Sequence, residues 1–206
     1  ATQDCEYLIE LASKAAKDAA ILRIDDNGNQ GDSCFYNVFP GEHYRILAGL
    51  LLEIKPKKCM DIGTHSGMSS RVMLDYSLAD VDTFDVIPWE NFGTHLEQKD
   101  FDSRLTQHLV DLSIENNFDD FVEVIDDADL ILCDAPKDGV FEYEFLELLS
   151  SVEFTKKPRY LMLDDIKFIN MAPLWRSIAT AKFDLTSFGH WSGTGLIDIS
   201  NGLLLN

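Results

Sequence analysis

The stretch CMDIGTHSG, residues 59–67, places an apolar run directly before a turn of small and polar residues. Glycines stand at both ends of the turn, at Gly63 and Gly67, with Thr64 between them. Glycine adopts backbone conformations that other residues avoid, and it lets another molecule approach the main chain closely. The pattern predicts a buried strand, then a tight loop that opens a helix and can hold a ligand against its backbone.

Strand-like and helix-like segments alternate beyond this stretch. Short apolar runs predict strands at 58–63, 81–87, 105–112, 129–135 and 159–166. Apolar residues at three- and four-residue intervals predict helices at 67–77, 89–101, 113–127, 141–151 and 170–182. Five strands interleaved with helices indicate a parallel sheet that is covered on both faces.

The two ends of the chain depart from this alternation. Residues 4–22 and the segment from Gly41 to residue 54 predict two helices, separated by a loop rich in Asp, Asn and Gly. The tail, residues 182–200, offers two strands with a glycine-rich turn and no helix, which predicts an antiparallel hairpin at one edge of the sheet. We expect a single domain over 1–206, with an N-terminal helix and loop (1–36) ahead of a Rossmann-like core (37–206).

The third strand has an alternative position. The run FVEVI at 121–125 also has strand character, but a strand there would leave almost no room for a helix before 129–135. Placing the strand at 105–112 keeps the alternation intact. The predicted fold is therefore α/β, a doubly wound and mostly parallel sheet of seven strands with a C-terminal antiparallel hairpin.

The composition excludes several classes of protein. Hydrophobic residues make up 46% of the chain, which supports a real core. The chain has no run of about 18 apolar residues, the length that would span a membrane. The first residues lack the pattern of a signal peptide, so we expect a soluble, cytoplasmic protein. The 36 acidic and 17 basic residues give a net charge of −19, which repels nucleic-acid phosphates and anionic membranes. Neither nucleic acid nor a membrane is an expected partner.

Acidic residues stand where the predicted strands end, and ligands of open parallel sheets bind at the carboxyl ends of strands. Asp85 lies one strand–helix–strand unit beyond Asp61, so the glycine loop and Asp85 can meet over one nucleoside. A carboxylate can accept hydrogen bonds from both ribose hydroxyls. We expect Asp85 on the ribose and Asp111, at the end of the next strand, near the base. The alternative is a glycine turn that merely joins a strand to a helix.

The loop also bears on which nucleoside is bound. Dinucleotide-binding loops usually have the pattern G-x-G-x-x-G, which disfavours an NAD-dependent dehydrogenase here. Asp61 would repel a pyrophosphate but suits a cofactor with an amino group or a sulfonium. The residues DIGTHSG resemble motif I of the class I S-adenosylmethionine-dependent methyltransferases, whose seven-stranded sheet ends in an antiparallel hairpin. The resemblance implies S-adenosyl-L-methionine as cofactor, with His65 and Ser69 at its methionine part.

A closer resemblance comes from CDAPKDG, residues 133–139. This segment is similar to one in the catechol and caffeoyl-CoA type O-methyltransferases, where an acid binds a divalent metal and a lysine three residues later acts as base. The resemblance implies Asp134 as a metal ligand and Lys137 as the base. The family's adjacent Asp-Asn pair corresponds to Asp164 and Asp165 here. The second Asp adds a negative charge, which either tightens metal binding or leaves only one of the pair as a ligand.

Weaker matches involve the two ends of the resembling region, which covers about residues 37–200. YNVFPGEH, residues 36–43, resembles the family's Asn-Val segment and implies Val38 beside the cofactor. His190 lies in the turn of the tail hairpin, where it is either an acceptor contact or a plain turn histidine. The three tryptophans could line an acceptor pocket or simply pack. His43, His95 and His108 show no ligand spacing.

These features predict an O-methyltransferase that acts on a hydroxyl of a small molecule, with Mg²⁺ or Ca²⁺ held by carboxylate oxygens. One alternative is a metal-independent methyltransferase in which Asp165 or His190 is the base. Another is a non-catalytic S-adenosylmethionine-binding protein, which the presence of Lys137 argues against. A homodimer is expected from the habit of the resembling family and from an N-terminal helix that the core sheet does not need.

Overall fold

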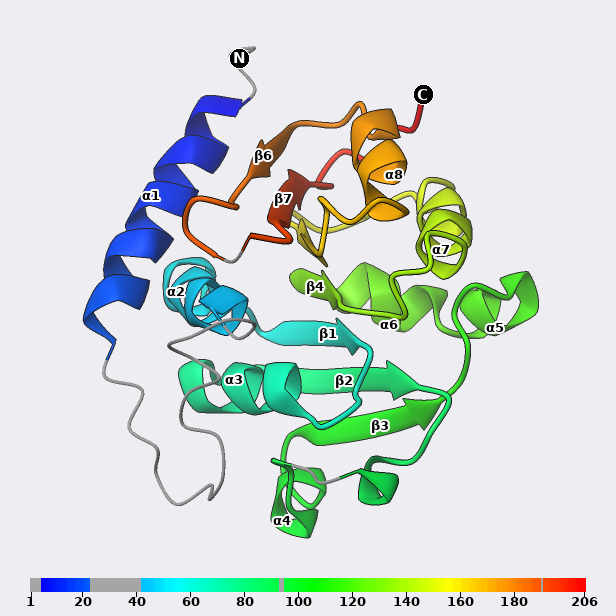
Figure 1. The fold of residues 1–206 in the computed structure, drawn as a ribbon. Coiled ribbons are helices and arrows are strands. Elements are labelled where there is room, and N and C mark those ends of the chain that lie inside the picture. The colour runs from blue at the N-terminus through cyan, green and yellow to red at the C-terminus, as the bar shows by residue number, and fades with distance from the viewer. Residues whose placement is uncertain (1–4, 23–41, 93–94, 190) are drawn as a thin grey trace.

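The computed structural model describes residues 5–22, 42–92, 95–189 and 191–206. In these residues one seven-stranded sheet has the order β3-β2-β1-β4-β5-β7-β6, with helices on both faces (Figure 1). The strands are β1 (Lys58–Ile62), β2 (Asp80–Asp85), β3 (Leu105–Leu109), β4 (Leu130–Cys133), β5 (Tyr160–Asp164), β6 (Lys182–Asp184) and β7 (Thr194–Asp198). The helices are α1 (Glu6–Ile21), α2 (Glu42–Ile54), α3 (Met68–Tyr76), α4 (Gln98–Phe101), α5 (Glu115–Asp120), α6 (Val122–Asp127), α7 (Phe141–Leu149) and α8 (Met171–Ser177), with a 3₁₀ turn η3 (Trp89–Asn91).

The pairing of the strands confirms the predicted fold class. Strands β1 to β5 pair in parallel, whereas β7 pairs antiparallel with both β5 and β6. The predicted hairpin therefore closes one edge of the sheet. The run FVEVI lies in α6 and its preceding residue, so the third strand is at 105–109, inside the predicted segment.

Side chains of β1 alternate between two cores, one on each face of the sheet. Cys59 packs in the core under α1, α2 and α3, whereas Met60 and Ile62 pack in the core under α5 to α8. Because successive strand residues point to opposite faces, Asp61 shares the face of Cys59. Its side chain is completely buried there, beneath α3.

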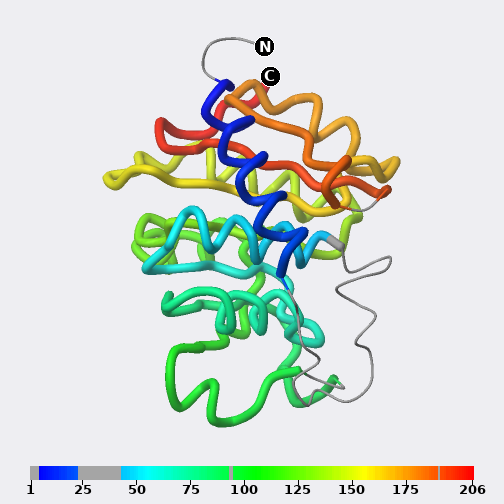
Figure 2. Tube along the Cα trace, turned by 90° about the vertical axis from the view of Figure 1, so that its left-hand side faces the viewer, coloured from blue at the N-terminus to red at the C-terminus, as the bar shows by residue number. Residues whose placement is uncertain are grey.

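The N-terminal helix is part of this architecture. Figure 2 shows α1 lying across α2 and the C-terminal strands. The two helices touch closely: a Cβ on Gly49 would lie 2.1 Å from the carbonyl oxygen of Ala15. Arg45 donates hydrogen bonds to the carbonyl oxygens of Ala19 and Leu22 at the end of α1. Since α1 covers its own chain, it no longer motivates a homodimer, which stays a prediction.

Three of the predicted helices differ from the structure. The segment 89–101 is the turn η3 followed by α4, because a capping box between Glu97 and Asp100 starts a new helix. The segment 113–127 divides at Phe121 into α5 and α6. The helix predicted for 170–182 ends at Ser177, where the chain turns to pair with Leu205 and then enters β6. No helix among the described residues is long and apolar enough to cross a bilayer.

Candidate functional site

The loop after β1 is shaped by its two glycines, which have φ angles of 105° at Gly63 and 77° at Gly67. A Cβ on Gly63 would lie 2.2 Å from the carbonyl oxygen of Asp134, so the loop passes directly over the end of β4. Gly67 is the N-cap of α3, and a Cβ there would overlap Leu96. The loop therefore joins the ends of β1 and β4 in one site.

Asp61 lies buried beneath this loop, and its role as a cofactor contact stays a prediction. Its Oδ2 accepts hydrogen bonds from the hydroxyls of Ser69 and Ser70 in α3 and of Thr83 in β2. Asp61 is not among the residues that line the pocket described below. Its Oδ1 is buried and accepts no hydrogen bond from any described residue, so a donor such as a ligand amino group would suit it.

Burial raises the pKa of Asp61 from 3.8 to about 6, although its three hydroxyl donors act to lower it. Between about pH 4 and 6 the folded chain keeps a proton here that the unfolded chain has lost, so stability falls as pH rises through this window. We predict that Asp61→Asn removes this part of the slope, which amounts to about 3 kcal/mol at neutral pH. Urea unfolding from pH 4 to 7 measures it, and identical slopes in both proteins would contradict the assignment.

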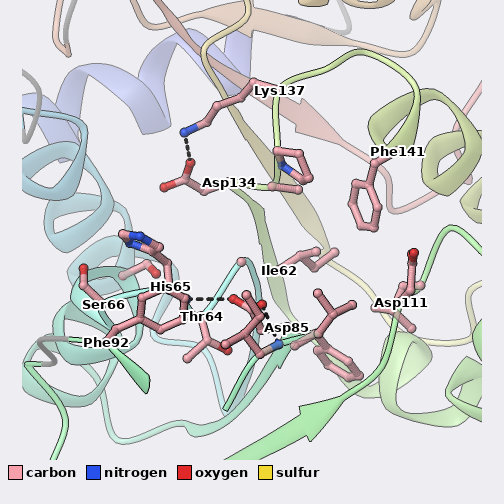
Figure 3. A pocket seen from close by; sticks show the side chains of 18 of the residues that line it. Ile62, Thr64, His65, Ser66, Asp85, Phe92, Asp111, Asp134, Lys137 and Phe141 are labelled. Carbon is pink, nitrogen blue, oxygen red and sulfur yellow. Dashed lines mark hydrogen bonds and ion pairs between the residues drawn. The ribbon is translucent and has the colours of Figure 1, made fainter. Parts of the chain in front are cut away.

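Asp85 fastens the end of β2 to the glycine loop. Its Oδ2 accepts the backbone N–H of His65 at 2.9 Å, and its Oδ1 accepts the backbone N–H of Ile87 at 3.0 Å (Figure 3). Each carboxylate oxygen has a second lone pair for a further donor. At the end of β3, the Oδ1 of Asp111 accepts the backbone N–H and the hydroxyl of Ser113.

A pocket of about 600 Å³ lies over these strand ends. Of the predicted cofactor residues, those lining it are Gly63, Thr64, His65, Ser69, Asp85 and Asp111; Gly67 does not line it, and Val38 lies outside the described residues. In Figure 3, His65, Ser66 and Phe92 lie on one side of the pocket and Asp111 and Phe141 on the other. Asp134 and Lys137 also line it, so the nucleoside-type residues and the acid–lysine pair share one cavity.

The predicted metal ligands and the predicted base lie together at the ends of β4 and β5. The Nζ of Lys137 lies 2.6 Å from Asp134 Oδ1, 3.2 Å from Asp165 Oδ2 and 3.8 Å from Asp164 Oδ2. The side chain of Asp164 is 3% exposed and that of Asp165 is 8% exposed. All four predicted residues are thus brought together, with the ammonium between the carboxylates.

Burial and the neighbouring charges shift the pKa values of both Asp134 and Lys137. Burial and the neighbouring Asp164 raise the pKa of Asp134, although Lys137 acts to lower it. Burial alone would lower the pKa of Lys137, but Asp134, Asp164 and Asp165 outweigh it and raise the pKa above its ordinary value. With no other cation present, Lys137 is therefore an ammonium that balances the carboxylates, and it holds its proton at neutral pH.

The loop that carries Lys137 is held by Glu142, a residue that the sequence analysis did not select. Glu142 is fully buried in the first turn of α7, and its two carboxylate oxygens accept the backbone N–H groups of Lys137 and Gly139. A Cβ on Gly139 would lie 2.7 Å from the carbonyl oxygen of Asn170, which follows β5. These contacts fix the height of Lys137 above the ends of β4 and β5.

Backbone strain gathers in the same loops. Among the described residues, four other than glycine have positive φ, and three of these are His65, Lys137 and Asp165, at 39°, 61° and 56°. The fourth, Lys55, directly follows α2. Such conformations are uncommon and persist where the surroundings impose them, often at functional sites. The strain therefore marks the predicted cofactor loop and the acid–lysine cluster as one constrained region.

A histidine without ligand spacing in the sequence also reaches the cluster. His43, in the first turn of α2, is 4% exposed, and its Nε2 lies 3.9 Å from Asp134 Oδ2. Possible ligand atoms of His43, Asp134 and Asp164 all lie within 4.8 Å of one another, and this set does not include Asp165. His190, the predicted acceptor contact, lies outside the described residues.

The tryptophans divide between packing and exposure. Trp89 stacks on Phe101, and Trp175 covers the backbone of β7 where a Cβ on Gly195 would overlap its ring. Trp191, between β6 and β7, is 66% exposed, and its ring centroid lies 5.9 Å from that of Phe168. Only Trp191 of the three therefore presents a largely open face.

Comparison with known proteins finds likeness in structure only. No protein-family model matches the sequence, and no curated protein matches it significantly. Cofactor-bound Rv0187 from MTB has a TM-score of 0.55 and 13% identity, over 96% of this chain and 91% of that one. The S-adenosylhomocysteine-bound methyltransferase PaMTH1 from Podospora anserina has a TM-score of 0.52 and 13% identity, over 94% and 87%.

A third solved structure is the MycE methyltransferase of the mycinamycin biosynthetic pathway, in complex with Mg, S-adenosylhomocysteine and mycinamycin VI. Its TM-score is 0.55 at 9% identity, and this chain spans half of its length. At such identities the likeness establishes the fold and leaves the chemistry to be argued from the site.

Proposed function

We propose that this chain binds S-adenosyl-L-methionine in the pocket and transfers its methyl group to a hydroxyl of a small molecule. One observation carries the proposal. A single cavity joins the nucleoside-type acids Asp85 and Asp111, at the ends of β2 and β3, to the ion pair of Asp134 and Lys137 at the end of β4. A binding protein needs the first of these features but has no use for the second. The structures of PaMTH1 and MycE, which share the fold, hold S-adenosylhomocysteine.

The residues that line the pocket suit the parts of such a cofactor. Asp85 offers carboxylate lone pairs to the ribose hydroxyls, and Asp111 and Phe141 flank the side assigned to adenine. His65 in the loop and Ser69 at the start of α3 lie at the side assigned to the methionine part, and Asp61, whose Oδ1 is unsatisfied, lies beneath them. The sulfonium would then face Asp134, whose carboxylate favours a positive charge.

The acid cluster also fits a divalent cation, because buried carboxylate oxygens at close range repel one another unless a positive charge lies between them. A bound cation would hold an acceptor hydroxyl and lower its pKa. Asp134 and Asp164 would supply oxygen ligands. Lys137, displaced from between the carboxylates and facing a positive charge, would have a lowered pKa and could take the hydroxyl proton at Nζ. The base role of Lys137 is therefore proposed for the cation-bound state alone.

A metal-independent methyltransferase remains the second candidate, and one observation favours it. Lys137 already supplies a cation within 3.8 Å of all three carboxylates, so the cluster is partly balanced without a metal. In that enzyme Asp165 would act as the base. Methyl transfer in the presence and absence of EDTA separates the two candidates, since only the first loses activity on chelation.

Asp85→Ala should weaken binding of S-adenosylhomocysteine at least tenfold, or about 1.4 kcal/mol. The change removes the proposed ribose acceptor and also frees the backbone N–H groups of His65 and Ile87. Isothermal titration calorimetry measures the affinity. Asp82→Ala is the matched control, because Asp82 lies on the same strand but pairs with His108 outside the pocket. Unchanged affinity in Asp85→Ala would refute the ribose assignment.

A further inference from the structure

We infer that His43 is a nitrogen ligand of the proposed cation site, and that the site therefore prefers a first-row transition metal to Mg²⁺ or Ca²⁺. The inference rests on the proposed function for the existence of a cation there. It changes the expected ligand set from three carboxylates to two carboxylates and an imidazole, His43, Asp134 and Asp164. The expected metal changes as well, from the hard Mg²⁺ or Ca²⁺ on oxygen ligands to a first-row transition metal.

The position of His43 supports a ligand role. His43 lies in the first turn of α2 and is 4% exposed. Its Nε2 lies 3.9 Å from Asp134 Oδ2. Atoms that share a metal at about 2.1 Å lie about 3 to 4 Å apart, depending on the angle at the metal. Ligand atoms of His43, Asp134 and Asp164 lie within 4.8 Å of one another, close to that spacing, and the Nζ of Lys137 would move away from Asp134 when a metal enters.

Asp165 has a different position in the cluster. It lies outside the set of converging ligand atoms, and its Oδ2 is 3.2 Å from the Nζ of Lys137. Its backbone has a φ of 56°, which turns it away from the regular course of β5. Of the adjacent acids, Asp164 is thus the ligand, and Asp165 is the carboxylate beside which the Nζ of Lys137 stays when a metal enters.

The chemistry of the donors sets the metal preference. Carboxylate and water oxygens suit Mg²⁺ and Ca²⁺, whereas an imidazole nitrogen suits transition metals, whose affinity for mixed N/O sites rises from Mn²⁺ to Co²⁺ and beyond. Mg²⁺ gains little from one imidazole because it is a hard cation that favours oxygen. Replacing His43 by an oxygen donor should therefore weaken Co²⁺ binding much more than Mg²⁺ binding.

The test measures metal binding by calorimetry without S-adenosylmethionine or acceptor. We expect one Co²⁺ per chain, at least tenfold weaker binding in His43→Gln, and less than about twofold change in Mg²⁺ affinity. His108→Gln is the matched control, because His108 also contacts a carboxylate, Asp82 at 2.7 Å, but lies outside the cluster. In that variant Co²⁺ affinity should be unchanged.

A direct readout is the electron spin-echo modulation of bound Mn²⁺, in which a coordinated imidazole gives a nitrogen signal. The signal should be present in the unmodified chain and in His108→Gln, and absent from His43→Gln. Equal Co²⁺ affinity and retained nitrogen modulation in His43→Gln would overturn the inference, as would a failure of both metals to bind. Binding that depends on His43 without any effect of metal on methyl transfer would refute metal catalysis and leave the ligand assignment standing.

Discussion

Lys137→Met is expected to lower methyl transfer at least about 100-fold while the affinity for S-adenosylhomocysteine stays within about threefold. Methionine keeps the length and the apolar stem of the side chain but can neither carry a positive charge nor accept a proton. Lys137 lies at the acid cluster end of the pocket, whereas the proposed ribose contact is made by Asp85. A group that acts in the transition state is lost mainly from turnover, and only slightly from binding.

The measurement uses a panel of catechol, phenol and polyol acceptors with methyl-labelled cofactor, and compares turnover on an acceptor that the unmodified chain accepts. Lys99→Met is a suitable control, because Lys99 also forms an ion pair, with Glu97 at 2.7 Å, but outside the pocket. Undiminished turnover in Lys137→Met would exclude Lys137 from the reaction. A parallel loss of cofactor affinity would mean that Lys137 acts by holding the pocket in shape.

Gly63→Ala is expected to abolish detectable cofactor binding and to destabilise the fold by about 3 kcal/mol. The added Cβ would lie 2.2 Å from a backbone oxygen, that of Asp134, which cannot rotate away as a side chain can. The chain must therefore separate the end of β1 from the end of β4. That separation moves the loop that carries His65 away from the residues opposite it in the pocket.

A second glycine isolates the clash from backbone strain. Gly202 has a φ of 92°, close to the 105° of Gly63, but a Cβ there meets nothing within 4 Å. Gly202→Ala should therefore cost about 1 kcal/mol, the strain alone, and leave cofactor affinity unchanged. Thermal unfolding and calorimetry of both variants give the comparison. Equal destabilisation in the two would show that the contact between Gly63 and Asp134 has no importance.

The sequence was sufficient to predict the sheet because its signals are local. The strands β1, β4 and β5 are short, mostly apolar runs that end in or directly before an acid or a glycine, and this pattern is visible in the sequence alone. Helix boundaries were predicted less well, since they depend on capping contacts such as that of Glu97 with Asp100 and on distant partners. The helix predicted for 170–182 ends at Ser177 because Ile178 pairs with Leu205 at the far end of the chain.

Some residues of the candidate site are also marked in the sequence, whereas others are brought in only by the fold. Asp85, Asp111, Asp134 and Lys137 could be found because strand ends are marked in the sequence and one segment resembles a known family. The sequence does not show that Asp61 is buried against the hydroxyls of α3, because this depends on where that helix packs. His43 and Glu142 carry no motif: His43 reaches the cluster only because α2 lies beside the ends of the strands, and Glu142 because its loop folds back.

Calorimetric titration of the unmodified chain with S-adenosylhomocysteine, with NAD in parallel, tests the central proposal most directly. It needs no knowledge of the acceptor, and it examines the cavity over the ends of β1, β2 and β3 on which the proposed function depends. The proposal predicts one molecule of S-adenosylhomocysteine bound per chain, an affinity that falls at least about tenfold in Asp85→Ala, and no binding of NAD. Binding of NAD without binding of S-adenosylhomocysteine would contradict it.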